Sequence, residues 1–441
     1  MNFNELVKTI KDCGVVGAGG AGFPSYAKFD KRCDTIILNC AECEPLLKLH
    51  RQLLERNAYE IISTLDLIAK TVEAERVIIG IKGSYKNALA AVEAQLDSFE
   101  NMSICRLPEI YPAGDEVILI QEATGKTVKA GSLPISIGVT VFNVETIYNV
   151  YNALQGKPVT HKYVTVAGEV NKPMTLCVPI GISIGELIDY AGGSTLPEYE
   201  IILGGPMMGN FGSRYDVVTK TTNAILVLPT DHYIVKKKQV NVSIDIKRTM
   251  AACCQCTYCT DLCPRNLLGH PIDPALFMRN ASNTMQETPY LDAAYCCSCG
   301  LCEMYSCGQG LSPRTLLAAV KADMRKNGLK PMPAEDRPIS PARSYRKVPM
   351  KRLAARIGVE KYNKTAPMLP DVLKPKTVTV MLSQHIGAPA RATVFPGTEV
   401  KCGDVIAVAA EGLSVNIHAS VNGTVTAVND KFIKIGVKTD E

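Results

Sequence analysis

The sequence predicts a multidomain protein of α/β and β modules with a cysteine-rich segment between them. A chain of 441 residues is too long for one ordinary hydrophobic core, so we expect several domains of ~100–150 residues each. Hydrophobic residues make up 46% of the chain and charged residues 21%, a balance typical of globular proteins. Ten of the 17 cysteines fall between Cys253 and Cys307. Together these observations exclude a disordered chain and indicate metal or redox chemistry.

The N-terminus and the hydropathy indicate neither secretion nor a membrane span. Residues 1–13 lack the basic, apolar and small-residue regions of a signal peptide. No apolar run reaches the ~18 residues that a span requires. We therefore expect a reducing, cytoplasmic location, where clustered cysteines bind metal or exchange electrons before they form disulfides. The net charge of +5 does not demand a nucleic acid partner.

The first part of the chain, residues 1–157, has the pattern of a layered α/β domain. Residues 35–38 and 77–80 are typical of buried parallel strands, and apolar residues at helical spacing lie between them, from 53 to 68. The amphipathic segment at 3–10 has two interpretations. It is either the first helix or a signal for encapsulation in a protein shell.

The rest of the chain divides by composition into four parts. Residues 158–232 combine short alternating strands, Gly/Pro turns and one helix, as in a small β-grasp module. Residues 245–330 have few strand signals and predict loops and short helices around the cysteines. Residues 331–375 are basic and rich in proline, a linker composition. Residues 376–441 contain closely spaced β segments, which predict a compact barrel or sandwich.

Two cysteine motifs carry the strongest chemical signal: C-x2-C-x2-C-x3-C-P at 253–264 and C-x2-C-x2-C-x4-C at 296–307. Three cysteines at this spacing lie on one tight loop and bind three corners of a cubane, and in two-cluster ferredoxins the fourth thiolate comes from the other motif. We therefore predict two [4Fe–4S] clusters. The first cluster site consists of Cys253, Cys256, Cys259 and Cys307, and the second cluster site consists of Cys296, Cys299, Cys302 and Cys263.

Zinc is the alternative for these cysteines, but tetrahedral zinc favours paired knuckles of two cysteines each. The second motif departs from the ferredoxin pattern in its x4 spacing and in having Gly308 where proline is usual. Cys254 and Cys297 adjoin predicted ligands. They are either alternate ligands or packed thiols.

A glycine-rich loop at 17–24 contains the pattern GxGxxG. A Rossmann dinucleotide site needs a strand directly before this pattern and a helix opening within it. Here the preceding strand is little more than Val15-Val16, and Pro24 suits only the first turn of a helix. The remaining hypotheses are a backbone that closely approaches a flat or anionic ligand, and a tight loop without a ligand.

Three polar motifs follow expected strands or turns, where ligands gather in open α/β sheets. With the glycine loop they form an ordered set of four: GAGGAGFPS at 17–25, NCAECEP at 39–45, YPAGDE at 111–116 and VFNVET at 141–146. This set resembles the flavin-binding subunit of respiratory complex I and the C subunit of Rnf complexes. It is most similar to the cobalamin reductases of propanediol-utilisation microcompartments, which carry a barrel-like module at the C-terminal end, as the segment 382–389 and the residues after it suggest here.

The resemblance implies a complex I-type FMN-binding α/β domain, an SLBB-like β-grasp module, a two-cluster ferredoxin-like segment and a C-terminal barrel-sandwich hybrid. It implies FMN and two [4Fe–4S] clusters as cofactors and NADH as substrate. The complex I pattern has an acid where this chain has Ala41, with Glu42 beside it. The residues that the resemblance places at FMN or the nicotinamide entrance are Gly17, Gly19, Gly20, Ala21, Gly22, Phe23, Lys28, Asn39, Glu44, Tyr111, Gly114, Asp115, Glu116 and Asn143.

The activity implied by the resemblance is electron transfer from NADH through FMN and both clusters to a corrinoid. A corrinoid adenosyltransferase and microcompartment proteins are the implied partners, and a homo-oligomer is compatible with the sequence. Two other hypotheses stay open: an Rnf-type subunit docked to a membrane ion pump, and a cluster-bearing scaffold without flavin. The C-terminal module also resembles biotinyl and lipoyl carriers, but residues 405–420 contain no lysine, so we expect a docking or packing role with a structural His418.

Overall fold

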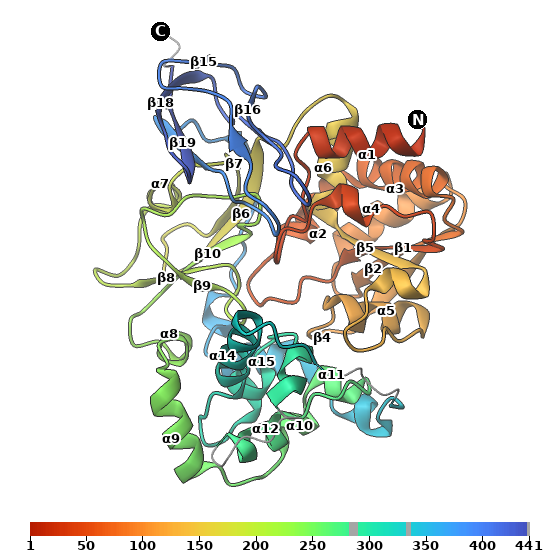
Figure 1. The fold of residues 1–441 in the computed structure, drawn as a ribbon, viewed down its shortest axis with the longest axis vertical. Coiled ribbons are helices and arrows are strands. Elements are labelled where there is room, and N and C mark those ends of the chain that lie inside the picture. Colours follow the sequence, from red (N-terminus) through yellow and green to blue (C-terminus); the bar gives the residue numbers. More distant parts are fainter. Residues whose placement is uncertain (282–289, 332–336, 439–441) are drawn as a thin grey trace.

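The computed structural model describes residues 1–281, 290–331 and 337–438. In Figure 1 an α/β domain lies on the right, two β modules lie at the upper left, and a helical cysteine-rich part lies below them. Within the described ranges, no helix has the length and apolar character needed to cross a membrane. Three stretches lie outside the described residues: 282–289 of the predicted cysteine-rich range, 332–336 of the predicted linker and 439–441 of the predicted C-terminal module.

The α/β domain is built on a parallel sheet of four strands in the order β3-β2-β1-β5. The predicted strands at 35–38 and 77–80 are confirmed as its two central strands. The strands are β1 (Thr35–Cys40), β2 (Arg76–Lys82), β3 (Met102–Leu107) and β5 (Val139–Asn143). Both faces of the central strands are buried, which explains their nearly continuous apolar sequence.

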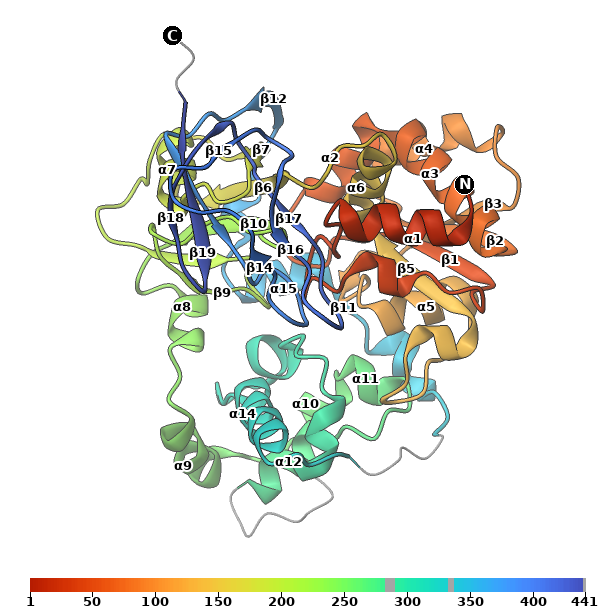
Figure 2. The same cartoon turned by 45° about the horizontal axis from the view of Figure 1, so that its top comes forward.

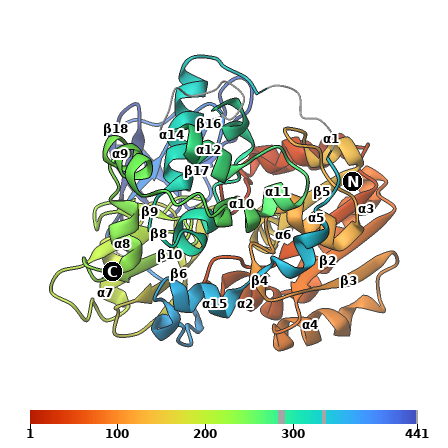
Figure 3. The ribbon, with the colours of Figure 1, turned by 90° about the horizontal axis from the view of Figure 1, so that it is seen from below.

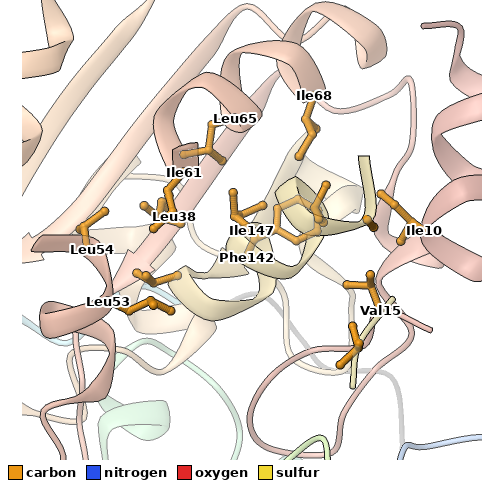
Figure 4. Packing of buried hydrophobic residues seen from close by; sticks show 14 of the residues in the cluster. Ile10, Val15, Leu38, Leu53, Leu54, Ile61, Leu65, Ile68, Phe142 and Ile147 are labelled. Atoms are coloured by element: carbon orange, nitrogen blue, oxygen red, sulfur yellow. The ribbon is translucent and has the colours of Figure 1, made fainter. Parts of the chain in front are cut away.

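Helices cover both faces of this sheet. One face carries α1 (Phe3–Asp12), α2 (Leu49–Arg56), α3 (Ala58–Val72), α4 (Lys86–Leu96) and α6 (Val144–Leu154), and the other carries α5 (Glu116–Thr124). Figure 4 shows Ile61 and Leu65 of α3 and Ile147 of α6 gathered over Leu38 of β1. Ile10 of α1 belongs to the same core, so the amphipathic N-terminal segment is the first helix of this domain.

The β-grasp module contains a six-stranded sheet in the order β12-β7-β6-β10-β8-β9, with α7 (Ile184–Tyr190) packed on it. Five strands come from its own range: β6 (His161–Gly168), β7 (Met174–Pro179), β8 (Glu200–Leu203), β9 (Asn210–Gly212) and β10 (Ala224–Leu228). The sixth, β12 (Met368–Val372), comes from far along the chain and pairs in parallel with β7.

The C-terminal module consists of two small antiparallel sheets, in the orders β13-β19-β18-β15 and β14-β16-β17. Figure 2 shows it beside α1 and in front of the β-grasp strands. Its apolar residues join the core of the α/β domain through residues such as Val380 and Ile433. The strands are β13 (Thr377–Met381), β14 (Arg391–Ala392), β15 (Glu399–Val400), β16 (Val405–Val408), β17 (Ile417–His418), β18 (Gly423–Val428) and β19 (Phe432–Val437).

The cysteine-rich part is a set of short helices around the two cysteine motifs. Seen from below in Figure 3, α10 and α11 lie beside the α/β domain. Its described helical elements are α8 (Tyr233–Lys238), α9 (Val242–Ala252), α10 (Tyr258–Asp261), α11 (Pro264–Leu267), α12 (Pro274–Asn280), η3 (Asp292–Tyr295), the π-helical turn η4 (Leu301–Ser306) and α14 (Pro313–Lys326).

The basic proline-rich segment that comes next lies against the α/β domain. Its elements include η5 (Pro341–Tyr345), β11 (Val348–Pro349) and α15 (Met350–Arg356), and β11 pairs with β4 (Ile110–Tyr111). Arg343 and Lys347 both form ion pairs with Glu122 of α5. Charge pairing and strand pairing therefore attach this segment to the folded domains.

Candidate functional site

A cleft of about 380 Å³ lies at the carboxyl ends of β1 and β5. Its size is sufficient for an organic cofactor, because such ligands occupy pockets of ~300–1000 Å³. The cleft wall brings together thirteen of the residues that the resemblance implied: Gly17, Gly19, Gly20, Ala21, Phe23, Lys28, Asn39, Glu44, Tyr111, Gly114, Asp115, Glu116 and Asn143. Gly22 is not part of this wall.

The glycine loop is a closed turn and not the opening of an α-helix. Gly17 N donates to Phe23 O at 2.8 Å, and the short 3-10 turn η1 (Ser25–Lys28) follows. Gly22 has a φ of +66°, and a Cβ there would lie 2.7 Å from Thr221 of the β-grasp module and 3.2 Å from His385 of the C-terminal module. The Rossmann hypothesis is therefore wrong for this loop, and Gly22 allows three domains to pack closely.

Three hydrogen bonds from Lys28 and Asn39 fix another part of the cleft wall. Lys28 Nζ donates to Glu116 Oε1 at 3.1 Å and to the Val141 carbonyl at 3.0 Å. Asn39 Nδ2 donates to the Gly114 carbonyl at 2.9 Å. A Cβ on Gly114 would lie 2.2 Å from the Ala41 carbonyl oxygen, so only glycine fits at this position.

Ser25 and Asn143 also present polar side chains at the cleft wall. Ser25 Oγ lies in the wall, its residue is 1% exposed, and this oxygen has no hydrogen-bond partner among the described residues. Asn143 precedes α6, and its side chain makes no capping hydrogen bond to the first N–H groups of that helix. The N-terminus of a helix favours anions, so these groups fit the hydroxyls and phosphate of a flavin mononucleotide. Sequence reasoning did not select Ser25, although it directly follows the glycine motif.

Glu44 lies in the wall, but the backbone of the β-grasp module holds its carboxylate. Met207 N and Met208 N each donate to one of its oxygens at 2.8 Å. Burial raises the pKa of the Glu44 carboxyl, while these two N–H groups oppose the rise. Glu42 is buried outside the cleft wall and accepts from His50 N at 2.8 Å. Glu42 and Glu44 are thus held by different parts of the fold, Glu42 by the backbone of α2 and Glu44 by the backbone of the β-grasp module.

The first cluster site surrounds a hollow near the surface. Cys253, Cys256, Cys259 and Cys307 all line it, together with Cys254. Burial raises the pKa of the Cys259 thiol to about 12, with smaller contributions from Cys307, Cys253 and Cys256. Cys307 of the second motif therefore lies near the cysteines of the first, as the cross-pairing hypothesis expects.

The second cluster site lies deeper. Burial raises the pKa of the Cys302 thiol, and Cys296 and Cys263 contribute to the rise. Cys299 and Cys302 are both buried. Cys263 of the first motif therefore lies near the cysteines of the second. In the described residues, no three His, Cys, Asp or Glu side chains are placed to hold a single metal ion. A [4Fe–4S] cluster instead takes one thiolate at each of its irons.

The second cluster site and the cleft share a wall. Cys297 and Cys299 line the same cleft as the glycine loop. The Tyr111 hydroxyl donates to the Cys299 carbonyl at 2.6 Å. A second hollow of about 240 Å³ adjoins the cleft and shares Phe23, Lys28 and Glu116 with it.

Comparison with known proteins finds four family models along the chain. They are the Nuo51 FMN-binding domain at 10–152, the SLBB domain at 163–211, the 4Fe-4S dicluster domain at 252–312 and the RnfC barrel sandwich hybrid domain at 357–440. The predicted fold class is confirmed by these matches. The chain is also 37% identical over 443 residues to the cobalamin reductase PduS of Salmonella typhimurium, covering 99% of this chain and 97% of that protein.

The chain belongs to the cobalamin reductase PduS family. The PduS protein of Citrobacter freundii is likewise 37% identical, over 97% of this chain and 95% of its own length. The C subunit of the ion-translocating oxidoreductase complex of Edwardsiella ictaluri is 34% identical, over 60% of this chain and 32% of its own length. PduS membership and the matches to FMN-binding and 4Fe-4S models support a flavin and iron–sulfur oxidoreductase.

Proposed function

We propose that this chain is an NADH-dependent cobalamin reductase that holds FMN in the cleft and a [4Fe–4S] cluster at each cysteine site. The observation that carries the proposal is the shared wall, because Cys297 and Cys299 line the same cleft as Gly17 and Gly20. The names of the PduS relatives support a corrinoid as the electron acceptor. A bound flavin exchanges two electrons with a nicotinamide and single electrons with iron–sulfur clusters.

The residues of the cleft have distinct roles in this proposal. The N-terminus of α6, Lys28 and Asn143 would hold the flavin phosphate, since a helix N-terminus and an ammonium group both attract anions. Ser25 Oγ is available for a flavin hydroxyl. The adjoining hollow beside Phe23 offers space for the nicotinamide substrate.

The burial of the cysteines supports an order for the two cluster sites. The second cluster site borders the cleft through Cys299, and Cys299 and Cys302 are buried, whereas Cys256 of the first cluster site is exposed. We therefore propose that electrons enter at the cleft and leave at the first cluster site. A corrinoid adenosyltransferase as partner, and a cytoplasmic location inside a bacterial microcompartment, are further parts of the proposal and rest on the family resemblance.

The test uses full-length protein purified without oxygen. Heat-released flavin, iron and sulfide are quantified first, and NADH is then added with hydroxocobalamin while the corrinoid spectrum is followed. The proposal expects FMN, both clusters and NADH-dependent reduction of the corrinoid. A Cys256→Ser variant is the control, because it should keep FMN and NADH-dependent ferricyanide reduction but lose most corrinoid reduction.

Two results would contradict the proposal. Strong ferricyanide reduction without any corrinoid reduction would favour an Rnf-type electron-transfer protein, which the 34% identity to the C subunit of the Edwardsiella complex over 60% of the chain makes the second candidate. A native preparation that contains clusters but never binds flavin would favour a cluster-bearing scaffold.

A further inference from the structure

An arginine lies beneath the wall that the cleft and the second cluster site share. Arg265 lies two residues after Cys263, on the short helix α11. Its Nη2 donates to Asp115 Oδ2 at 2.8 Å, and the two side chains are only 15% and 14% exposed. Its Nε is buried and has no hydrogen-bond partner among the described residues. The guanidinium brings a positive charge close to the second cluster loop, and the carboxylate of Asp115 offsets part of it.

Each partner of Arg265 belongs to a different part of the redox site. Asp115 lines the cleft and caps α5, where its carboxylate accepts from Val117 N and Ile118 N at 3.2 Å. The Cys297 thiol, which also lines the cleft, lies near the guanidinium and interacts with it electrostatically. The three side chains therefore form a continuous chain from the flavin cleft to the loop of the second cluster site.

A second cation lies on the far side of the same loop. Lys321 of α14 donates from Nζ to the Cys296 carbonyl at 2.7 Å. Net charge around an iron–sulfur cluster helps to set its reduction potential. A nearby cation favours the reduced form, because reduction adds negative charge to the cluster.

We propose that Arg265 is a positioning residue that fixes the second cluster loop against the cleft and raises the reduction potential of the cluster there. This inference rests on the proposed function, since it needs flavin and clusters to be present. The charge of Arg265 then favours transfer of electrons out of the cleft. Asp115 partly offsets this charge and holds the guanidinium in place.

The test is the Arg265→Gln variant of the full chain, with the potential of the second cluster followed by anaerobic titration and electron paramagnetic resonance. We expect its reduction equilibrium to become about tenfold less favourable, which corresponds to about 59 mV for one electron. Arg343→Gln is the matched control. Arg343 also forms a buried ion pair with α5, through Glu122, at 14% and 16% exposure, but neither partner lines the cleft.

Two more variants separate charge from structural damage. Arg265→Lys should recover most of the potential, because it keeps the cation. Asp115→Asn should shift the potential upward, since it leaves the cation uncompensated. Equal potentials in Arg265→Gln and Arg343→Gln would overturn the inference, as would a downward shift in Asp115→Asn. The potentials of the variants are compared with that of wild-type protein in which FMN and both clusters have first been quantified. If the wild-type protein lacks one of these cofactors, the proposed function fails, and this result is distinct from a failure of the inference about Arg265.

Discussion

The Tyr111 hydroxyl and the Cys299 carbonyl form a hydrogen bond of 2.6 Å that joins the cleft to the second cysteine motif. Both residues line the cleft, and Tyr111 is only 2% exposed. Tyr111 lies on β4, which also pairs with β11 from the segment after the cysteine-rich part. Tyr111 therefore links three regions that are far apart in the sequence, through its hydroxyl and through its backbone.

The Tyr111→Phe variant should fold but lose this connection. We expect its free energy of unfolding to fall by about 1 kcal/mol, because a buried acceptor loses its donor. NADH should still reduce the flavin, while reduction of the second cluster should slow. Stopped-flow absorbance of anaerobic protein measures the two steps separately, and an unchanged cluster rate would contradict the role of this contact.

The cross-pairing of the cysteine motifs can be tested by serine variants. Loss of one cluster should remove about half of the iron in each variant. Each variant should keep one cluster, whose electron paramagnetic resonance spectrum can be recorded. If the predicted sets are correct, the spectrum of Cys307→Ser matches that of Cys253→Ser, and the spectrum of Cys263→Ser matches that of Cys296→Ser. Motifs that each bind their own cluster would instead make Cys307→Ser match Cys296→Ser. Cys254→Ser should keep the wild-type iron content.

Air should destroy the first cluster before the second. Cys256 of the first cluster site is exposed, while Cys299 and Cys302 of the second are buried. Oxygen and water therefore reach the first cluster more easily. Iron release and resonance spectra during timed exposure to air measure the order, with the Cys307→Ser protein as the reference for the second cluster alone. Simultaneous loss of both signals would contradict the difference in burial.

Gly114→Ala should reduce flavin content. A Cβ there would lie 2.2 Å from the Ala41 carbonyl oxygen, so the cleft wall must shift. The matched control is Gly83→Ala, since a Cβ at Gly83 meets nothing within 4 Å among the described residues. We expect severalfold weaker FMN binding for the first variant and wild-type binding for the second, as measured by fluorescence of released flavin. Equal binding in both would show that the Gly114 contact does not shape the cleft.

Lys220 should make stability depend on pH. It is 3% exposed and donates to the Gly14 carbonyl at 2.6 Å and the Asn416 carbonyl at 3.2 Å, which joins three domains. Burial lowers its pKa from 10.5 to about 7. The unfolded chain therefore binds the proton more tightly, and the free energy of unfolding should rise as pH increases from about 7 to about 10.

The size of this effect is about 1.4 kcal/mol per pKa unit. Denaturant unfolding at several pH values measures it, and Lys220→Met should remove the rise. Burial also lowers the pKa of His418, to about 4, so its contribution falls in a separate, acidic window. A rise of equal size in the Lys220→Met protein would contradict the assignment.

The sequence was informative wherever the signal is local. The spacing of Cys253, Cys256 and Cys259 predicts a single tight loop, and in the structure these three residues line one hollow. The strand at 35–38 is equally local, since its apolar run needs burial on both faces. The glycine motif predicted a close backbone approach, although its individual contacts could not be predicted.

Contacts between distant segments could not be predicted. Arg265 and Asp115 are separated by 150 positions, and neither residue type identifies its partner from sequence alone. The same holds for Arg343, whose basic neighbourhood is typical of a linker but which pairs with Glu122. Ser25 is a common residue type, and only the fold shows that its hydroxyl is buried without a partner among the described residues.

The strands on either side of the cysteine-rich part have a consequence for turnover. β10 precedes it in the β-grasp sheet, and β11 and β12 come after it, paired with β4 and β7. Both ends of the cysteine-rich part are thus anchored to the other domains. Under the proposed function, we therefore expect electrons to cross a distance that is set when the chain folds, without movement of a carrier domain in each cycle.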